Sequence, residues 1–234
     1  MVSIRYLSVT QFRIFRPDAV PFALLRTPVG SGHLKTQMGF RTVGFNAETG
    51  DLVFEDGAFR RNEGGPLIVV TSAAFNNRRI VLSVIGDSEL AQGAYATIQE
   101  LFSASGFTLP DPVISTEETI CVAELDFEWQ ALLNPEISSM ATEFAKGLPV
   151  VPRIRGAGIK ITFGFSPDQH LEEYGANLND KQLVVEPRAD VPLSERVYFT
   201  ASPSGSEAHI ALVEALEARI MRKTEKRPGK HSRA

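Results

Sequence analysis

The chain has 234 residues, of which 43% are hydrophobic and 22% charged, so it can bury a sizeable core in one large domain or two smaller ones. Its single cysteine, Cys121, excludes an internal disulfide and a site built from several thiolates. No stretch approaches the roughly 18 apolar residues of a membrane span, and arginines interrupt the N-terminal segment where a signal peptide needs an apolar run. We therefore expect a globular, cytoplasmic protein without membrane association.

Charge is unevenly distributed along the chain. The formal net charge is −4, but residues 219–234 contain seven Lys or Arg and a single acid, so this end carries +6 and residues 1–218 carry −10. Pro228 and Gly229 interrupt the basic end, and a helix that enters it is expected to end by about residue 225. Residues 223–234 are therefore predicted to form a basic, flexible tail.

In chain order, the first half begins with an alternating strand and closes with an amphipathic helix. Pro17, Pro21 and Pro28 indicate that any helix after the first strand is short or replaced by a loop. The glycine-rich stretch 29–39 is predicted to be a flexible loop around His33, because it matches no phosphate-binding motif. Strands are predicted at 2–9, 40–45, 51–55, 67–71 and 79–85, and the closing helix at 88–102.

The second half reads in the same order. Alternation in the strand 119–127 places Cys121 on the apolar side, so we interpret it as a core residue and not as a nucleophile. Asn134 and Pro135 are typical of a helix start, and Gly147 of its end. Further strands are predicted at 158–165, 182–187 and 196–201, and the closing helix at 206–220.

The two halves match at an offset of 118 residues. Ser88-Glu89 falls on Ser206-Glu207 at the two closing helices, where we interpret the serines as caps, and Arg16-Pro17-Asp18 falls on Asn134-Pro135-Glu136. Such matches are typical of an internal duplication, although unrelated α/β stretches share similar patterns. The sequence predicts an α+β fold of two tandem similar halves, residues 1–117 and 118–222, each an antiparallel sheet covered by helices, related by a pseudo-twofold axis.

Two groups of side chains carry potential chemistry. His209 lies near Ser204, Ser206 and Glu207, as in a serine nucleophile with its base, but the position at a helix start favours capping and surface roles. A second group, in a predicted turn, holds metal-capable side chains whose spacing matches no known ligand pattern: Asp168, His170, Glu172 and Glu173. We predict no metal site and no cofactor.

Basic residues in loops and in the tail fit a nucleic-acid surface, because Lys and Arg contact phosphates. The candidate residues are Arg60, Arg61, Arg78, Arg79, Arg153, Arg155, Arg222, Lys223, Lys226, Arg227, Lys230 and Arg233. The competing interpretation is that they are solvated loop charges that pair with an acidic body.

No convergent set of His, Cys, Ser and carboxylates is evident in the sequence. We therefore expect a non-catalytic binding or assembly subunit of a larger complex, which presents loops and a sheet edge to a protein partner or self-associates. Two alternatives stay open: a nucleic-acid-associated protein that uses the basic tail and arginine loops, and an enzyme with a site between the two halves, where pockets tend to form.

Overall fold

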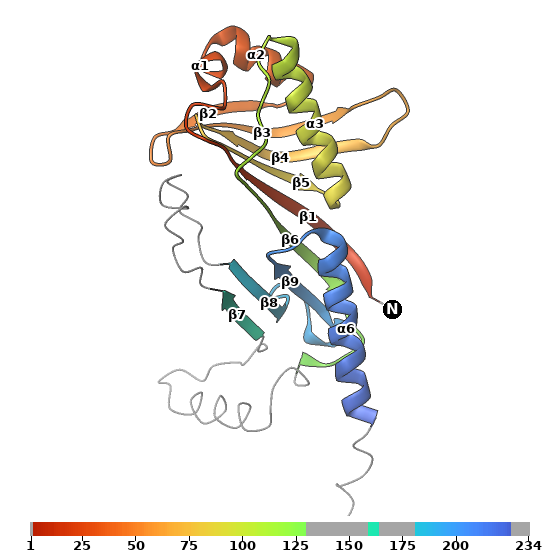
Figure 1. The fold of residues 1–234 in the computed structure, drawn as a ribbon. Coiled ribbons are helices and arrows are strands. Elements are labelled where there is room, and N and C mark those ends of the chain that lie inside the picture. Colours follow the sequence, from red (N-terminus) through yellow and green to blue (C-terminus); the bar gives the residue numbers. More distant parts are fainter. Residues whose placement is uncertain (1, 130–158, 164–180, 226–234) are drawn as a thin grey trace, which may run out of the picture.

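The structure is a computed structural model that describes residues 2–129, 159–163 and 181–225. In these ranges the chain has a mixed α+β fold with one nine-stranded antiparallel sheet (Figure 1). The strands are β1 (Ser3–Ile14), β2 (Thr42–Asn46), β3 (Asp51–Arg60), β4 (Leu67–Phe75), β5 (Arg79–Ile85), β6 (Ile114–Glu124), β7 (Ile159–Phe163), β8 (Lys181–Pro187) and β9 (Val197–Ser202). The helices are α1 (Phe22–Leu25), α2 (Pro28–Gln37), α3 (Ser88–Ala104) and α6 (Ser206–Glu225), with a 3-10 turn at Leu193–Glu195. Each of the nine predicted strands corresponds to one of these.

A single sheet runs through both predicted halves, in the order β2-β3-β4-β5-β1-β6-β9-β8-β7. The β1–β6 ladder extends from Ser3 opposite Glu124 to Ile14 opposite Ile114. The sequence predicts one sheet in each half. The structure differs because the first strand of one half pairs with the first strand of the other, which merges the strands into one sheet.

The four described helices pack on one side of the sheet, called the helix face below (Figure 1). α3 contacts β4, β5 and β1, while α6 contacts β1 and β9. Leu7 and Val9 lie on the same side of β1 because strand side chains alternate. Leu7 packs into the cluster beneath α6 and Val9 into the cluster beneath α3. The two clusters therefore share one side of the sheet, and the opposite side, called the open face below, carries no helix among the described residues.

The closing helices are confirmed at both predicted positions. α3 begins after Asp87, whose carboxylate accepts a hydrogen bond from Leu90 N at 2.9 Å. Its buried stripe is Ala91, Ala94, Tyr95, Ile98 and Phe102, and α6 buries Val213 and Ile220 against β6, β8 and β9. The prediction that Ser88 caps α3 is wrong, because the preceding aspartate takes that position.

The stretch 29–39, predicted as a flexible loop, mostly belongs to helix α2. The Thr27 hydroxyl accepts a hydrogen bond from Gly30 N at 3.0 Å, and Pro28 occupies the first turn, where its missing N–H has no cost. Leu34 is buried in the core. Capping and this anchor offset the low helix propensity of the glycines, so the loop prediction is wrong.

Several predictions lie outside the described residues, including the helix between Asn134 and Gly147 and the tail from residue 226 onward. α6 ends at Glu225, as expected from the sequence. Among the described helices, none has the length and apolar character needed to cross a membrane.

Candidate functional site

His209 lies on α6 with its side chain fully buried. Its Nε2 hydrogen bonds with Thr200 Oγ1 at 2.8 Å, and its Nδ1 with Ser202 Oγ at 2.7 Å. The predicted surface position of His209 is therefore wrong. Alternation along β9 places both hydroxyls on the helix face, where α6 covers them.

This Ser–His contact has the hydrogen bond of a nucleophile–base pair, but not its accessibility. Ser202 is 2% exposed and His209 is 0% exposed, so a substrate would not reach either group. Burial also lowers the pKa of His209 to about 4. The imidazole is therefore neutral at pH 7, with one ring nitrogen donating and the other accepting. The pair is a structural polar contact between β9 and α6.

Cys121 lies in the core beneath α6 with 1% of its surface exposed, which confirms the predicted core position. Burial raises the pKa of its thiol. A buried thiol with a raised pKa holds little reactive thiolate near neutral pH, so Cys121 does not have the environment of a nucleophile.

The N-termini of α3 and α6 meet over the centre of the sheet. Ser88 N donates to Ser206 Oγ, and Ser206 N donates to Ser88 Oγ, both at 2.9 Å. The two hydroxyl oxygens are 3.2 Å apart. Each serine therefore satisfies a free amide at the start of the other helix. The residues matched at the 118-residue offset are in direct contact.

The carboxylate of Glu117, on β6, lies beside these two helix starts. Its Oε2 accepts from Ser88 Oγ at 2.7 Å, and its Oε1 accepts from Gln11 Nε2 at 2.9 Å. A negative charge is favoured there, because the N-terminal end of a helix is positive. The chain before α6 approaches closely: a Cβ on Gly205 would lie 2.7 Å from Glu117 Oε2.

Arg13 extends this network along β1. Its guanidinium lies 3.9 Å from the centroid of the Tyr95 ring and donates to Gln92 Oε1 at 2.8 Å. The Tyr95 hydroxyl is buried without a hydrogen-bond partner among the described residues, and burial raises its pKa. We call the following set the junction network: Gln11, Arg13, Ser88, Gln92, Glu117 and Ser206. The network joins elements of both halves through hydrogen bonds, and its charged side chains, Arg13 and Glu117, bond to other members of the network.

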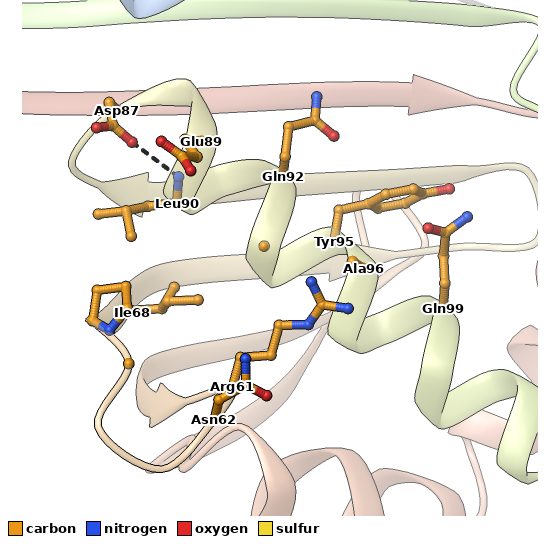
Figure 2. Close-up of a pocket in the computed structure, with 13 residues that line it drawn as sticks. Arg61, Asn62, Ile68, Asp87, Glu89, Leu90, Gln92, Tyr95, Ala96 and Gln99 are labelled. Carbon is orange, nitrogen blue, oxygen red and sulfur yellow. Dashed lines mark hydrogen bonds between the residues drawn. The ribbon is translucent and has the colours of Figure 1, made fainter.

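A groove with a volume of about 790 Å³ lies between α3 and the β3–β4 turn (Figure 2). Figure 2 shows Arg61 extending from the turn toward α3, where it forms an ion pair with Glu100. Ile68, Leu90 and Tyr95 supply apolar lining, and Asn62, Gln92 and Gln99 supply amide groups. The lining contains no His or Cys. Two carboxylates, Asp87 and Glu89, also line the groove, and that of Asp87 accepts from Leu90 N.

The two described arginine pairs lie at opposite ends of β4. Arg60 and Arg61 stand at the β3–β4 turn, and Arg78 and Arg79 at the β4–β5 turn. Arg79 forms an ion pair with Asp51, and Arg60 donates to the Gly65 carbonyl. Arg78 lines a hollow of about 590 Å³ beside α1. The structure does not bring the two pairs together, and the guanidinium groups of Arg60, Arg61 and Arg79 have local acceptors.

The other candidate residues are at or beyond the end of α6 or outside the described ranges. Arg222 and Lys223 lie in the last turns of α6. The remaining basic candidates and the metal-capable group lie outside the described residues: Arg153, Arg155, Lys226, Arg227, Lys230, Arg233, Asp168, His170, Glu172 and Glu173. Within the described part of the chain, no three His, Cys, Asp or Glu side chains are arranged to hold a metal.

The open face is the feature that sequence reasoning missed. Register places Thr10 opposite Ser83 and Phe12 opposite Val81, on the side of β1 away from the helices. Their neighbours on the helix face are fully buried, whereas these side chains are only partly covered. The half-buried set on this face includes Ser8, Thr10, Phe12, Val81, Ser83, Ile120 and Phe199. The centre of the open face therefore combines apolar and hydroxyl side chains with Glu118, which lies opposite Thr10.

Charged groups of both signs surround this centre. Arg5 pairs with Glu124 where β1 meets β6, and Arg79 pairs with Asp51 toward the β2 side of the sheet. Glu55 on β3 accepts a hydrogen bond from the Thr42 hydroxyl at 3.1 Å. Only alternation along the strands could have indicated this surface in the sequence, and alternation does not say which side of a sheet the helices cover.

The chain matches no protein-family model, and no curated protein is significantly similar to it in sequence. The function is therefore inferred from the geometry of the described residues.

Proposed function

We propose that the protein is a non-catalytic binding or assembly subunit whose open face docks on a protein partner. The observation that carries the proposal is the placement of all four described helices on the opposite side of the sheet. This placement leaves Phe12, Val81 and Phe199 partly covered, whereas Val122 and Ala201 on the same side of the sheet are buried. An apolar centre within a charged rim is the usual composition of a protein–protein interface.

The charges on the open face support a protein partner over a nucleic acid. A surface that follows phosphates needs an excess of available cations, because affinity comes from replacing bound counterions. Arg5 and Arg79 on this face are instead paired with carboxylates, and Glu118 lies beside Thr10 in the β1–β6 ladder. A nucleic-acid role for the tail and an enzymatic site between the halves both stay predictions.

We also propose that the two halves arose by duplication and are related by a pseudo-twofold axis between β1 and β6. In each half the last strand lies beside the first, as β5 beside β1 and β9 beside β6. The reciprocal hydrogen bonds between Ser88 and Ser206 support the same relation. The test is an experimental structure in which residues 2–104 superpose on 120–222 strand by strand. Closing helices at unrelated positions would contradict it.

Site-specific photo-crosslinking tests the proposed docking face. A photoreactive residue is placed at Thr10 on the open face, or at Leu212, which is 43% exposed on α6, and the full chain is expressed in its source cells. We expect discrete cross-linked species of higher mass from Thr10 and none from Leu212. Absence of a cross-link from Thr10, or the same species from both positions, would contradict the proposal.

A further inference from the structure

We propose that two copies of this chain self-associate by pairing their β2 strands, so that the sheet continues from one copy into the other. β2 is the terminal strand of the described sheet, beyond β3. All five of its residues are exposed, and its outer backbone groups are unpaired by any described strand. The pairing uses the backbone edge of β2 and its side chains on the helix face, so the inference does not depend on the proposed function.

β2 lacks the devices that keep exposed sheet edges apart. Natural edge strands carry charged residues, prolines or bulges that oppose pairing with a second chain. β2 has the sequence TVGFN, with no charge and no proline, and its pairing with β3 is regular from Thr42 to Asn46. A Cβ at Gly44 would meet no atom within 4 Å, so the middle of the strand is open to approach.

Apolar side chains accompany this edge on the helix face. Phe45 is 55% exposed and Val43 is 36% exposed, and both project to the side on which α2 packs. The Arg26 guanidinium lies 5.6 Å from the centroid of the Phe45 ring, which places the start of α2 beside it. Val29, in the first turn of α2, is 81% exposed. Backbone hydrogen bonds between two β2 strands and burial of these apolar side chains would therefore both stabilise the association.

The strand is self-complementary in one antiparallel register. Centred on Gly44, this register sets Val43 of each copy opposite Phe45 of the other, and Thr42 opposite Asn46. In this register apolar side chains lie opposite apolar ones and polar side chains lie opposite polar ones, and such cross-strand pairs stabilise neighbouring strands. The same register brings Arg41 of each copy to the end where the hairpin turn of the other copy carries Glu48, so opposite charges meet at both ends. A parallel register would instead place like charges together. The occupant that fits this edge is therefore a second copy, related by twofold symmetry.

Sedimentation equilibrium of the purified full chain tests the pairing. At about 0.1 mM, a concentration suited to an interface of this small size, the wild type is expected to have close to twice the chain mass. Val43→Lys is expected to weaken association about tenfold or more, because the lysine faces Phe45 of the other copy. The matched control Leu212→Lys, at a position on α6 that is 43% exposed against 36% for Val43, should leave association unchanged. A wild type that is monomeric at this concentration, or a dimer that Val43→Lys does not weaken, would overturn the inference.

The double variant Val43→Lys/Phe45→Glu tests the register itself. It places opposite charges across the strand pair at both positions, so association should recover relative to Val43→Lys alone, while Val43→Lys/Phe45→Lys should remain monomeric. Amide hydrogen exchange in β2 should slow as the wild-type concentration rises. An unrecovered double variant, or exchange in β2 that is independent of concentration, would contradict pairing centred on Gly44. None of these measurements involves the open-face partner, so failure here leaves the proposed function standing.

Discussion

The backbone N–H groups of Ser88 and Ser206 each donate a hydrogen bond to the hydroxyl of the other residue, and Glu117 accepts a hydrogen bond from the Ser88 hydroxyl. Two helices from distant parts of the chain are thereby tied at their starts. Unsatisfied amides at a buried helix start cost free energy, so the exchange stabilises the docking of α3 and α6 together. The serines in the repeated Ser-Glu sequence therefore act between the helices.

Alanine variants measure this exchange. Ser88→Ala and Ser206→Ala should each lower the free energy of unfolding by about 1 kcal/mol, because each removes the acceptor for an amide at the start of the other helix. Each amide–hydroxyl hydrogen bond involves only one of the two side chains, so the double variant should lose about the sum of the two single losses in urea unfolding experiments. Single variants as stable as the wild type would show that the serines do not satisfy these amides.

The buried His209 predicts a specific pH dependence. Its pKa is about 4 in the folded chain and about 6.5 in an unfolded one, so between these values only the unfolded state binds the proton. Its contribution to the free energy of unfolding is fully present above about pH 6.5. This contribution, on the order of 3 kcal/mol, is lost as the pH falls toward 4. NMR titration of the imidazole should show no protonation of His209 above about pH 5.

Urea unfolding of the wild type and of His209→Gln gives the second readout for this histidine. The wild type should lose stability relative to the variant as the pH falls from about 7 to about 4. A His209 that titrates near 6.5 would show that the side chain is solvated and that the buried Ser202–His209 contact is incorrect.

At the scale of elements, α3 is held by its apolar stripe. Ile98 is fully buried against the sheet, and Phe102 packs edge-on against Phe75 with ring centroids 6.4 Å apart. Ile98→Ala should lower the free energy of unfolding by about 2–5 kcal/mol, since it leaves a cavity beneath the helix. The exposed Leu212→Ala is the control and should change it by less than about 0.5 kcal/mol. Equal losses from both variants in urea unfolding would contradict the assigned helix face.

Local patterns predicted the elements well, because alternation and helical stripes are local signals. Both closing helices and the nine strands were predicted in order, and Cys121 was placed correctly in the core. α2 was missed because its glycines suggest a loop, while its stability comes from the Thr27 cap and the buried Leu34. The burial of His209 was missed because it depends on hydroxyls of β9 that only the folded chain brings beneath α6.

At the scale of the whole molecule, the continuous sheet depends on contacts between residues far apart in the chain. β1 pairs with β6 across more than 100 residues, as in Leu7 opposite Cys121. No local pattern specifies that pairing, so the sequence predicted two sheets and gave no indication of an open face. The candidate residues named from the sequence were local clusters, and the described ones lie at separate ends of strands, on α6 or inside the core.

Recovery of partners by matched variants tests the open face most directly. The tagged full chain is purified from its source cells as the wild type, as Val81→Lys at the centre of the open face, and as Leu212→Lys on α6. Co-purifying proteins are quantified by mass spectrometry, and the melting temperature confirms that each variant is folded. We predict that a specific partner is retained by the wild type and by Leu212→Lys, and is reduced about tenfold or more with Val81→Lys, since a lysine there opposes burial of the apolar centre. Equal recovery of the same proteins with all three chains would contradict docking through the open face.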